Sequence, residues 1–168
     1  NVEFAGRDGA KDMKAVMELY NQKIPLPLMP DATRPNTIEE GLKCIGGKPI
    51  INSTNLEDGE DNFETYCKLA KKYGAVLVCL VIDEEGMART AEKKVAIAKR
   101  MYDLAVGKHG LKPENIMFDM LAFTVGTGEE EDRLAGLHAY NAIKEIHEIY
   151  PDVGSTLGLS NISFGLEK

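Results

Sequence analysis

The stretch Lys48-Pro-Ile-Ile-Asn-Ser-Thr-Asn55 is typical of a short buried strand that ends abruptly in polar residues. Its apolar part, 49–51, has the composition of a strand, and four polar side chains follow directly. Strands of an α/β barrel end in this way at the face that carries the catalytic groups. The stretch therefore predicts one strand of a parallel sheet whose carboxyl end contributes polar groups to a site.

Four further apolar runs end in the same manner, each in an Asp or an Asn. These runs end at Asp31, Asp83, Asp119 and Asn161. The run 75–82 is apolar throughout, as strands buried on both faces of a parallel sheet are. Together with Asn52, these strand ends predict one polar cup assembled from many strands.

Helical and extended patterns alternate along the whole chain. Apolar spacing predicts helices over 10–20, 37–44, 60–73, 90–107 and 129–150. Strands are expected between them, over 26–30, 49–51, 75–82, 116–119 and 156–159. This alternation predicts an α/β fold with a parallel sheet. An open doubly wound sheet would gather its ligand residues at one switch point, usually beside a Gly-rich turn.

The polar residues here are spread over every strand end, which favours a parallel (β/α)8 TIM barrel. A complete barrel takes about 250 residues. We therefore expect the 168 residues to form an incomplete barrel, a fragment of a longer protein.

Composition excludes several classes of function. The chain is 43% hydrophobic and 28% charged, with a net charge of −7 and no basic block, which argues against nucleic-acid and anionic-membrane partners. No apolar run approaches the roughly 20 residues of a membrane span, and no signal peptide is recognisable. The three cysteines show no metal-binding spacing, so we expect a cytoplasmic protein with reduced, buried thiols and no metal site.

Three segments carry a resemblance to a known family. They are Gly41-Leu-Lys-Cys-Ile-Gly-Gly-Lys-Pro-Ile-Ile-Asn-Ser53, Ile82-Asp-Glu-Glu-Gly-Met-Ala-Arg-Thr90 and Gly158-Leu-Ser-Asn-Ile-Ser-Phe-Gly-Leu166. With Phe118-Asp119 and Thr127-Gly-Glu-Glu130 between them, they resemble the pterin-binding domain of cobalamin-dependent methionine synthases, in order over 1–166. The resemblance implies that 1–168 is part of a single pterin-binding barrel domain holding about strands 2–7. Residues 1–4 would end strand two, and the N- and C-terminal strands would be absent.

The function that this resemblance implies is methyl transfer in methionine biosynthesis. The domain would bind 5-methyltetrahydrofolate and present its N5-methyl group to a cob(I)alamin held by another domain of the parent chain, with zinc confined to a separate homocysteine domain. Elementary chemistry agrees, because a flat, neutral, hydrogen-bonding pterin is suited to short Asp and Asn side chains. Hydrogen bonds that stabilise positive charge at N5 would also lower the barrier to methyl release.

The resemblance also assigns roles to the strand-end residues. Asp31, Asn52 and Asp119 fall where the family binds the pterin edge, and Asn161 falls where it places a catalytic Asn near N5. Asp83 is a further pterin-binding candidate. The alternative for each is structural, since Asx residues routinely cap turns, and 83–85 is equally typical of a solvated loop.

The chain departs from the family pattern in three places. Met120-Leu121 stands where many members have Pro-Asn after the Asp, so one pterin contact is expected to differ. Pro30 replaces the usual aliphatic residue before Asp31, and Met87 stands where Gln is common.

Three other functions remain open from the sequence. A freestanding methyltransferase that serves a corrinoid/iron–sulfur protein has a similar 158–166 ending. Dihydropteroate synthase shares the barrel but needs basic residues for a pterin diphosphate, and only Arg34 lies beside a strand end. A non-catalytic, weakly pterin-binding fragment is the third, and its open sheet edges would favour self-association.

Overall fold

The computed structural model describes residues 6–166, so the predicted strand end at 1–4 lies outside the described residues. Its main sheet has four parallel strands, β1 (Ile50–Thr54), β2 (Val76–Leu80), β5 (Ile116–Asp119) and β6 (Gly154–Thr156), in that spatial order. Residues 28–32 run beside β1, because Ile50 N donates to Leu28 O and Asn52 N donates to Pro30 O.

The spatial order of these strands is also their order along the chain, which is the arrangement of a barrel. A doubly wound sheet reverses its strand order at a switch point, and the described strands show no reversal. The structure thus confirms the expected parallel barrel architecture, present in part.

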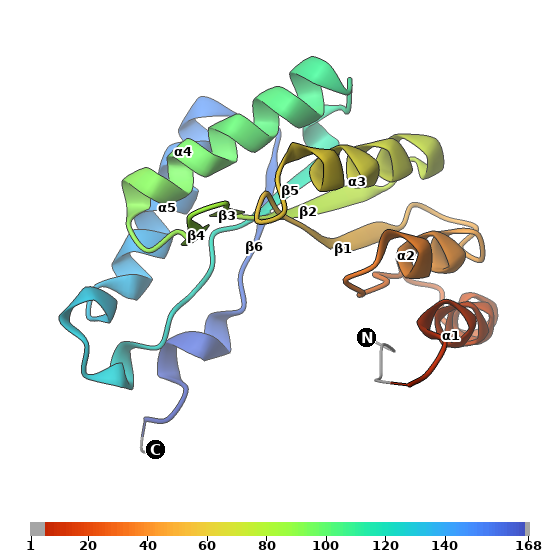
Figure 1. The fold of residues 1–168 in the computed structure, drawn as a ribbon, viewed down its shortest axis with the longest axis horizontal. Coiled ribbons are helices and arrows are strands. Elements are labelled where there is room, and N and C mark those ends of the chain that lie inside the picture. The colour runs from red at the N-terminus through yellow and green to blue at the C-terminus, as the bar shows by residue number, and fades with distance from the viewer. Residues whose placement is uncertain (1–5, 167–168) are drawn as a thin grey trace.

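Within residues 6–166, five α-helices cover one side of this curved sheet. They are α1 (Gly9–Lys23), α2 (Pro35–Leu42), α3 (Glu60–Tyr73), α4 (Ala91–Tyr102) and α5 (Ala135–Ile149). Helix α1 packs against α2, α2 against α3, and α4 against α5. Figure 1 shows α1, α2, α3 and α4 in an arc around the strands. A π-helical turn, Asp103–Lys108, extends α4.

Local sequence explains where these helices begin and end. The Thr90 side chain accepts a hydrogen bond from Lys93 N and caps α4. Pro35 begins α2 two residues before the expected start at 37, and Thr37 therefore lies buried inside the helix. Gly74 ends α3 in the left-handed conformation, at φ 63°, where a side chain would add strain.

The strand register separates a helix-facing core from a second, more open face. Cys79 and Phe118 are register partners and are fully buried, whereas Leu80 and Asp119, one residue further along, are half-buried. Successive strand side chains point to opposite faces. Asp119 therefore lies on the face away from the helices, at the carboxyl end of its strand.

Four predicted elements differ from the structure. The run 75–82 is divided, because β2 ends at Leu80 and β3 (Ile82–Asp83) turns back to pair antiparallel with β4 (Gly86–Met87). Residues 26–30 form no regular strand, since two of them are prolines without an N–H to donate.

The strand expected at 156–159 ends at Thr156, and a 3-10 helix, Leu159–Ser163, follows. Helix α5 begins at Ala135 rather than at the expected 129, because two 3-10 turns, Val125–Thr127 and Glu130–Asp132, precede it.

The thiols largely follow expectation. Cys67 and Cys79 are buried, while Cys44 is only half-buried. Burial raises the pKa of the Cys67 thiol to about 12 and that of Cys79 well above its ordinary value, which makes both poor nucleophiles. No helix among residues 6–166 combines the length and apolarity that crossing a membrane requires.

Candidate functional site

Polar strand-end residues line up along the carboxyl edge of the sheet. Asp31 pairs with Asn52 in a parallel bridge, and Leu80, Asp119 and Thr156 are successive register partners. Three of the five predicted site residues, Asp31, Asn52 and Asp119, therefore lie on adjoining parts of one edge.

A cavity of about 310 Å³ opens at the ends of β5 and β6. It is lined by Met87, Asp119, Leu121, Ala122, Phe123, Thr124, Gly158 and Asn161. We call it the Asp119 cavity. It brings together Asp119 and Asn161, which are 42 positions apart in the sequence. Apolar walls with a carboxylate and an amide suit a flat heterocycle that has both a ring face and a hydrogen-bonding edge.

The carboxylate of Asp119 is held in place by its own loop. Leu121 N donates to Oδ1 at 2.8 Å. Burial raises the pKa of Asp119, while the bond from Leu121 and the nearby charge of Lys94 act in the opposite direction. A carboxylate has about four acceptor positions, so Asp119 keeps acceptor capacity for a ligand.

Asn161 reaches the Asp119 cavity from a 3-10 helix rather than from a strand end. Its backbone oxygen accepts a hydrogen bond from Thr124 Oγ1 at 2.9 Å, which ties the segments after β5 and β6 together. A Cβ built on Gly158 would lie 3.2 Å from Asn161 Nδ2. Glycine at 158 therefore gives the amide room beside the backbone.

A second cavity, of about 240 Å³, lies at the end of β1, and we call it the Asp31 cavity. It is lined by Asp31, Ala32, Thr33, Ser53, Thr54, Asn55, Glu57, Asp58, Asn62, Tyr66 and Leu80. Tyr66 OH donates to Thr33 O at 2.9 Å and so supports the turn that follows Asp31. Asp31 is a predicted pterin-binding residue, and Ser53, Thr54 and Asn55 belong to the polar end of the stretch 48–55. No signal in the sequence indicated Asn62 and Tyr66, which belong to α3.

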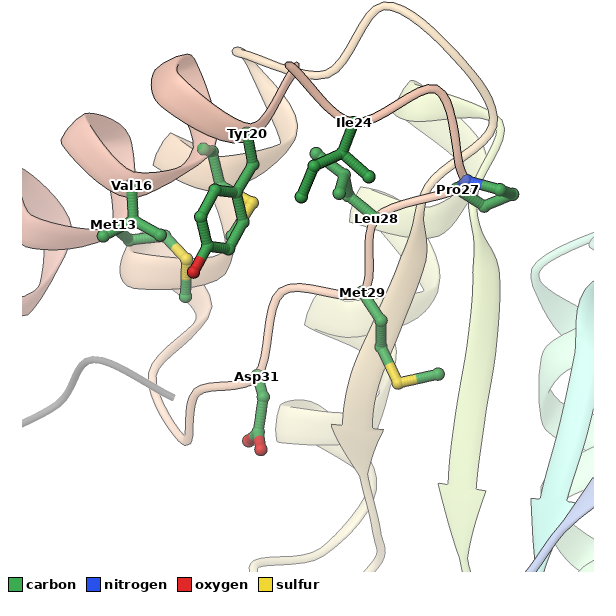
Figure 2. A pocket seen from close by; sticks show the side chains of 9 residues that line it. Met13, Val16, Tyr20, Ile24, Pro27, Leu28, Met29 and Asp31 are labelled. Carbon is green, nitrogen blue, oxygen red and sulfur yellow. The ribbon is translucent and has the colours of Figure 1, made fainter. Parts of the chain in front are cut away.

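Asp31 also lies at the edge of a larger, mostly apolar cavity between α1 and the 27–31 segment, of about 380 Å³. Figure 2 shows Met13, Val16 and Tyr20 on one side of it and Met29 on the other. The carboxylate of Asp31 is directed away from these side chains, along the direction in which the neighbouring strands run. Asp31 therefore faces the carboxyl edge.

The other two predicted residues are placed differently. The Asp83 carboxylate lies 2.6 Å from Lys93 Nζ and accepts a hydrogen bond from Glu85 N at 3.0 Å, in the β3–β4 hairpin. Asp83 does not line the Asp31 or the Asp119 cavity, and neither does Asn52, which lies inside β1 beside Asp31. Within residues 6–166, no group of three His, Cys, Asp or Glu side chains is arranged to hold a metal ion.

The residue that sequence reasoning missed most clearly is Lys94. It lies on α4 with no exposed surface, and its ammonium reaches the segment after β5. A signal was present, since Lys94 falls among Ala91, Val95 and Ala98 on the buried face of the helix. A charged residue inside an apolar stripe calls for a partner in the core.

Leu121 provides a test of the loop geometry. Its φ is +55°, the left-handed region that Asn tolerates and that β-branched residues avoid. We expect Leu121→Val to lower the free energy of unfolding by about 1–2 kcal/mol. Leu121→Asn is expected to stay within about 1 kcal/mol of the wild type, because the relieved backbone offsets the lost apolar contact. Urea denaturation measures both.

The same pair of substitutions at Leu159 is the control, since Leu159 is exposed and lies in a 3-10 helix. There we expect Val and Asn to differ little. Equal stability of the Val and Asn variants at 121 would show that the left-handed backbone does not govern this position.

Comparisons with known proteins agree with this geometry. The family model described as "Pterin binding enzyme" matches residues 2–168. The chain is 46% identical over 168 residues to a methionine synthase of Mycobacterium tuberculosis (strain ATCC 25618 / H37Rv) and 43% identical to one of Mycobacterium leprae (strain TN). Each match covers 98% of this chain and 14% of the relative, so the chain spans about one seventh of those proteins. The chain belongs to the pterin-binding enzyme family.

Proposed function

We propose that this chain binds 5-methyltetrahydrofolate at the carboxyl edge of its sheet, as the folate-binding part of a methionine synthase. The observation that carries the proposal is the Asp119 cavity, where a half-buried carboxylate and an amide meet between apolar walls. The donor edge of a pterin, with its ring N–H and amino group, matches a carboxylate acceptor. The similarity to two methionine synthases supports folate as the source of that pterin.

Some of these strand-end residues would bind the pterin, and Asn161 would activate its N5 for methyl transfer. Asp119 would accept the donor edge of the pterin, and Asp31 and Asn52 would extend the polar edge on the neighbouring strands. Asn161 would lie near N5, where its amide can stabilise the positive charge that N5 must gain before the N5–methyl bond breaks. The apolar walls exclude water and so strengthen these hydrogen bonds.

The methyl acceptor would come from outside this chain. Cob(I)alamin would be held by another domain of the parent protein and would supply the nucleophile that takes the methyl group. The described residues contribute the folate side of that reaction: they orient the pterin, keep N5 reachable at the open carboxyl edge, and stabilise tetrahydrofolate as the leaving group.

Calorimetric titration of the protein with 5-methyltetrahydrofolate tests this function. The matched control ligand is p-aminobenzoylglutamate, which carries the tail of folate without the pterin ring. We expect saturable binding of 5-methyltetrahydrofolate and none of the tail at the same concentrations. Equal binding of both ligands, or no binding of either by folded protein, would contradict a pterin site.

A further inference from the structure

Lys94 carries a positive charge into the core directly behind the Asp119 cavity. Its side chain has no exposed surface. Its Nζ donates to Ala88 O at 2.8 Å, to Met120 O at 2.5 Å and to Leu121 O at 3.1 Å. An ammonium has three donors, and here each has a carbonyl partner. The buried charge is therefore fully hydrogen-bonded, as a core lysine must be.

One peptide group connects this ammonium to the Asp119 carboxylate. Met120 O accepts from Lys94 Nζ, and the N–H of the same peptide group, that of Leu121, donates to Asp119 Oδ1 at 2.8 Å. Hydrogen bonds in such a chain polarise one another. The ammonium therefore strengthens and orients the bond that fixes the carboxylate, although Lys94 itself does not line the cavity.

The backbone at this point needs such support. Leu121, with φ +55°, is the one residue other than glycine with a positive φ among residues 6–166. The third bond of Lys94 goes to Leu121 O, and the ring centroid of Phe123, a wall of the cavity, lies 4.9 Å from Nζ. A strained backbone persists where its surroundings fix it, and such sites concentrate where ligands bind. Lys94 contacts the strained segment at three residues.

We propose that Lys94 is a positioning residue for pterin binding: its ammonium fixes the 119–123 segment, and through the 120–121 peptide it aims the Asp119 carboxylate into the cavity. This inference rests on the proposed function of the Asp119 cavity. It extends that function to a residue outside the cavity, on the helix that follows β4. The bond to Ala88 O also ties the segment before α4 to the cavity wall.

A purely structural role would predict a different outcome. A lysine that only fills space is replaceable by methionine, which has a similar length and no charge. Burial lowers the pKa of Lys94 to about 8, against the pull of the Asp119 charge, so the ammonium form still predominates at pH 7. Lysine therefore places in the core a charge that methionine would not. The ammonium in return fixes three backbone carbonyls by hydrogen bonds.

The test compares Lys94→Met with Ile97→Ala, a buried apolar change on the same helix that reaches no cavity residue by hydrogen bond. Each variant is titrated calorimetrically with 5-methyltetrahydrofolate, and hydrogen exchange is followed at the amides of 119–124. We expect Lys94→Met to weaken binding by about tenfold and to speed exchange in this segment. Ile97→Ala is expected to lower stability while leaving both readouts near the wild type.

Lys94→Gln serves as a second variant, because its amide retains two donors and the protein should fold even if Lys94→Met does not. Its affinity is expected to fall between those of the wild type and the Met variant. Wild-type affinity and exchange in Lys94→Met, or in Lys94→Gln if the Met variant does not fold, would overturn the positioning role alone. Equal losses in Ile97→Ala would overturn it as well. Absence of binding by the wild type would overturn the proposed function and this inference together.

Discussion

Replacing Asp119 by asparagine is expected to weaken the binding of 5-methyltetrahydrofolate by about 100-fold. The asparagine can still accept the hydrogen bond from Leu121 N through its oxygen, so the loop keeps its geometry. Its amino group, however, then faces the donor edge of the pterin, where a second acceptor is required. A hydrogen bond to a charged group contributes about 1.5–3 kcal/mol, and each 1.4 kcal/mol is a factor of about ten in affinity.

Two matched substitutions separate this effect from a general change of charge. Asp103→Asn removes an exposed carboxylate from the π-helical turn after α4 and is expected to leave the affinity within about twofold. Asp83→Asn removes a buried strand-end carboxylate that is already paired with Lys93. It is expected to cost less affinity than Asp119→Asn. Calorimetry measures the affinity of all three variants for 5-methyltetrahydrofolate. Equal losses from Asp83→Asn and Asp119→Asn would contradict the proposal that the Asp119 carboxylate binds the pterin edge.

Much of the architecture could be predicted because it is encoded locally. The apolar run 75–82 has the composition of a strand buried on both faces, and the structure places β2 inside it. The carboxyl ends of parallel strands lie at the same edge of a sheet. A polar residue that follows each apolar run is therefore predicted to lie at that edge, without any knowledge of side-chain contacts. Asp31, Asn52 and Asp119 follow this logic, and the register confirms that they lie along one edge.

The strand ends themselves were less predictable, because they depend on turns and on distant partners. Asp83 ends the longest apolar run, yet it belongs to the short β3–β4 hairpin, where its carboxylate pairs with Lys93 on α4. Asn161 lies beyond the end of β6, in a 3-10 helix tied to Thr124. Neither contact has a local signature, since the residues involved are 10 and 37 positions apart in the sequence.

The start of α5 shows the same limitation at a helix. The sequence from Glu129 onward has helical spacing, but the segment is held in 3-10 turns by Asp132, which is buried and accepts hydrogen bonds from Arg89 and from Thr127 Oγ1. An ion pair between a buried aspartate and an exposed arginine 43 positions away is set by tertiary structure. Helical propensity is a weak prior that such contacts override.

The second large effect is expected in the pH dependence of the free energy of unfolding. Comparison with a Lys94 variant separates the contribution of Lys94 from that of other groups. Burial lowers the pKa of Lys94 from an ordinary value of 10.5 to about 8, with the Arg89 charge acting in the same direction and the Asp119 charge opposing both. Between those two values the unfolded chain holds a proton that the folded protein has released. Stability rises with pH wherever the unfolded state binds more protons. Lys94 should therefore make the folded protein more stable as the pH increases from about 8 to about 10.5.

The expected size follows from the shift, since each pKa unit corresponds to 1.36 kcal/mol. The free energy of unfolding of the wild type, minus that of Lys94→Met, should rise by up to about 3 kcal/mol over this range. Taking the difference removes the contributions of tyrosines and cysteines, which both proteins share. Urea denaturation at several pH values measures it, with Lys99→Met on the exposed face of α4 as the control. Parallel pH curves for the wild type and Lys94→Met would mean that the Lys94 ammonium is as well solvated in the folded protein as in water.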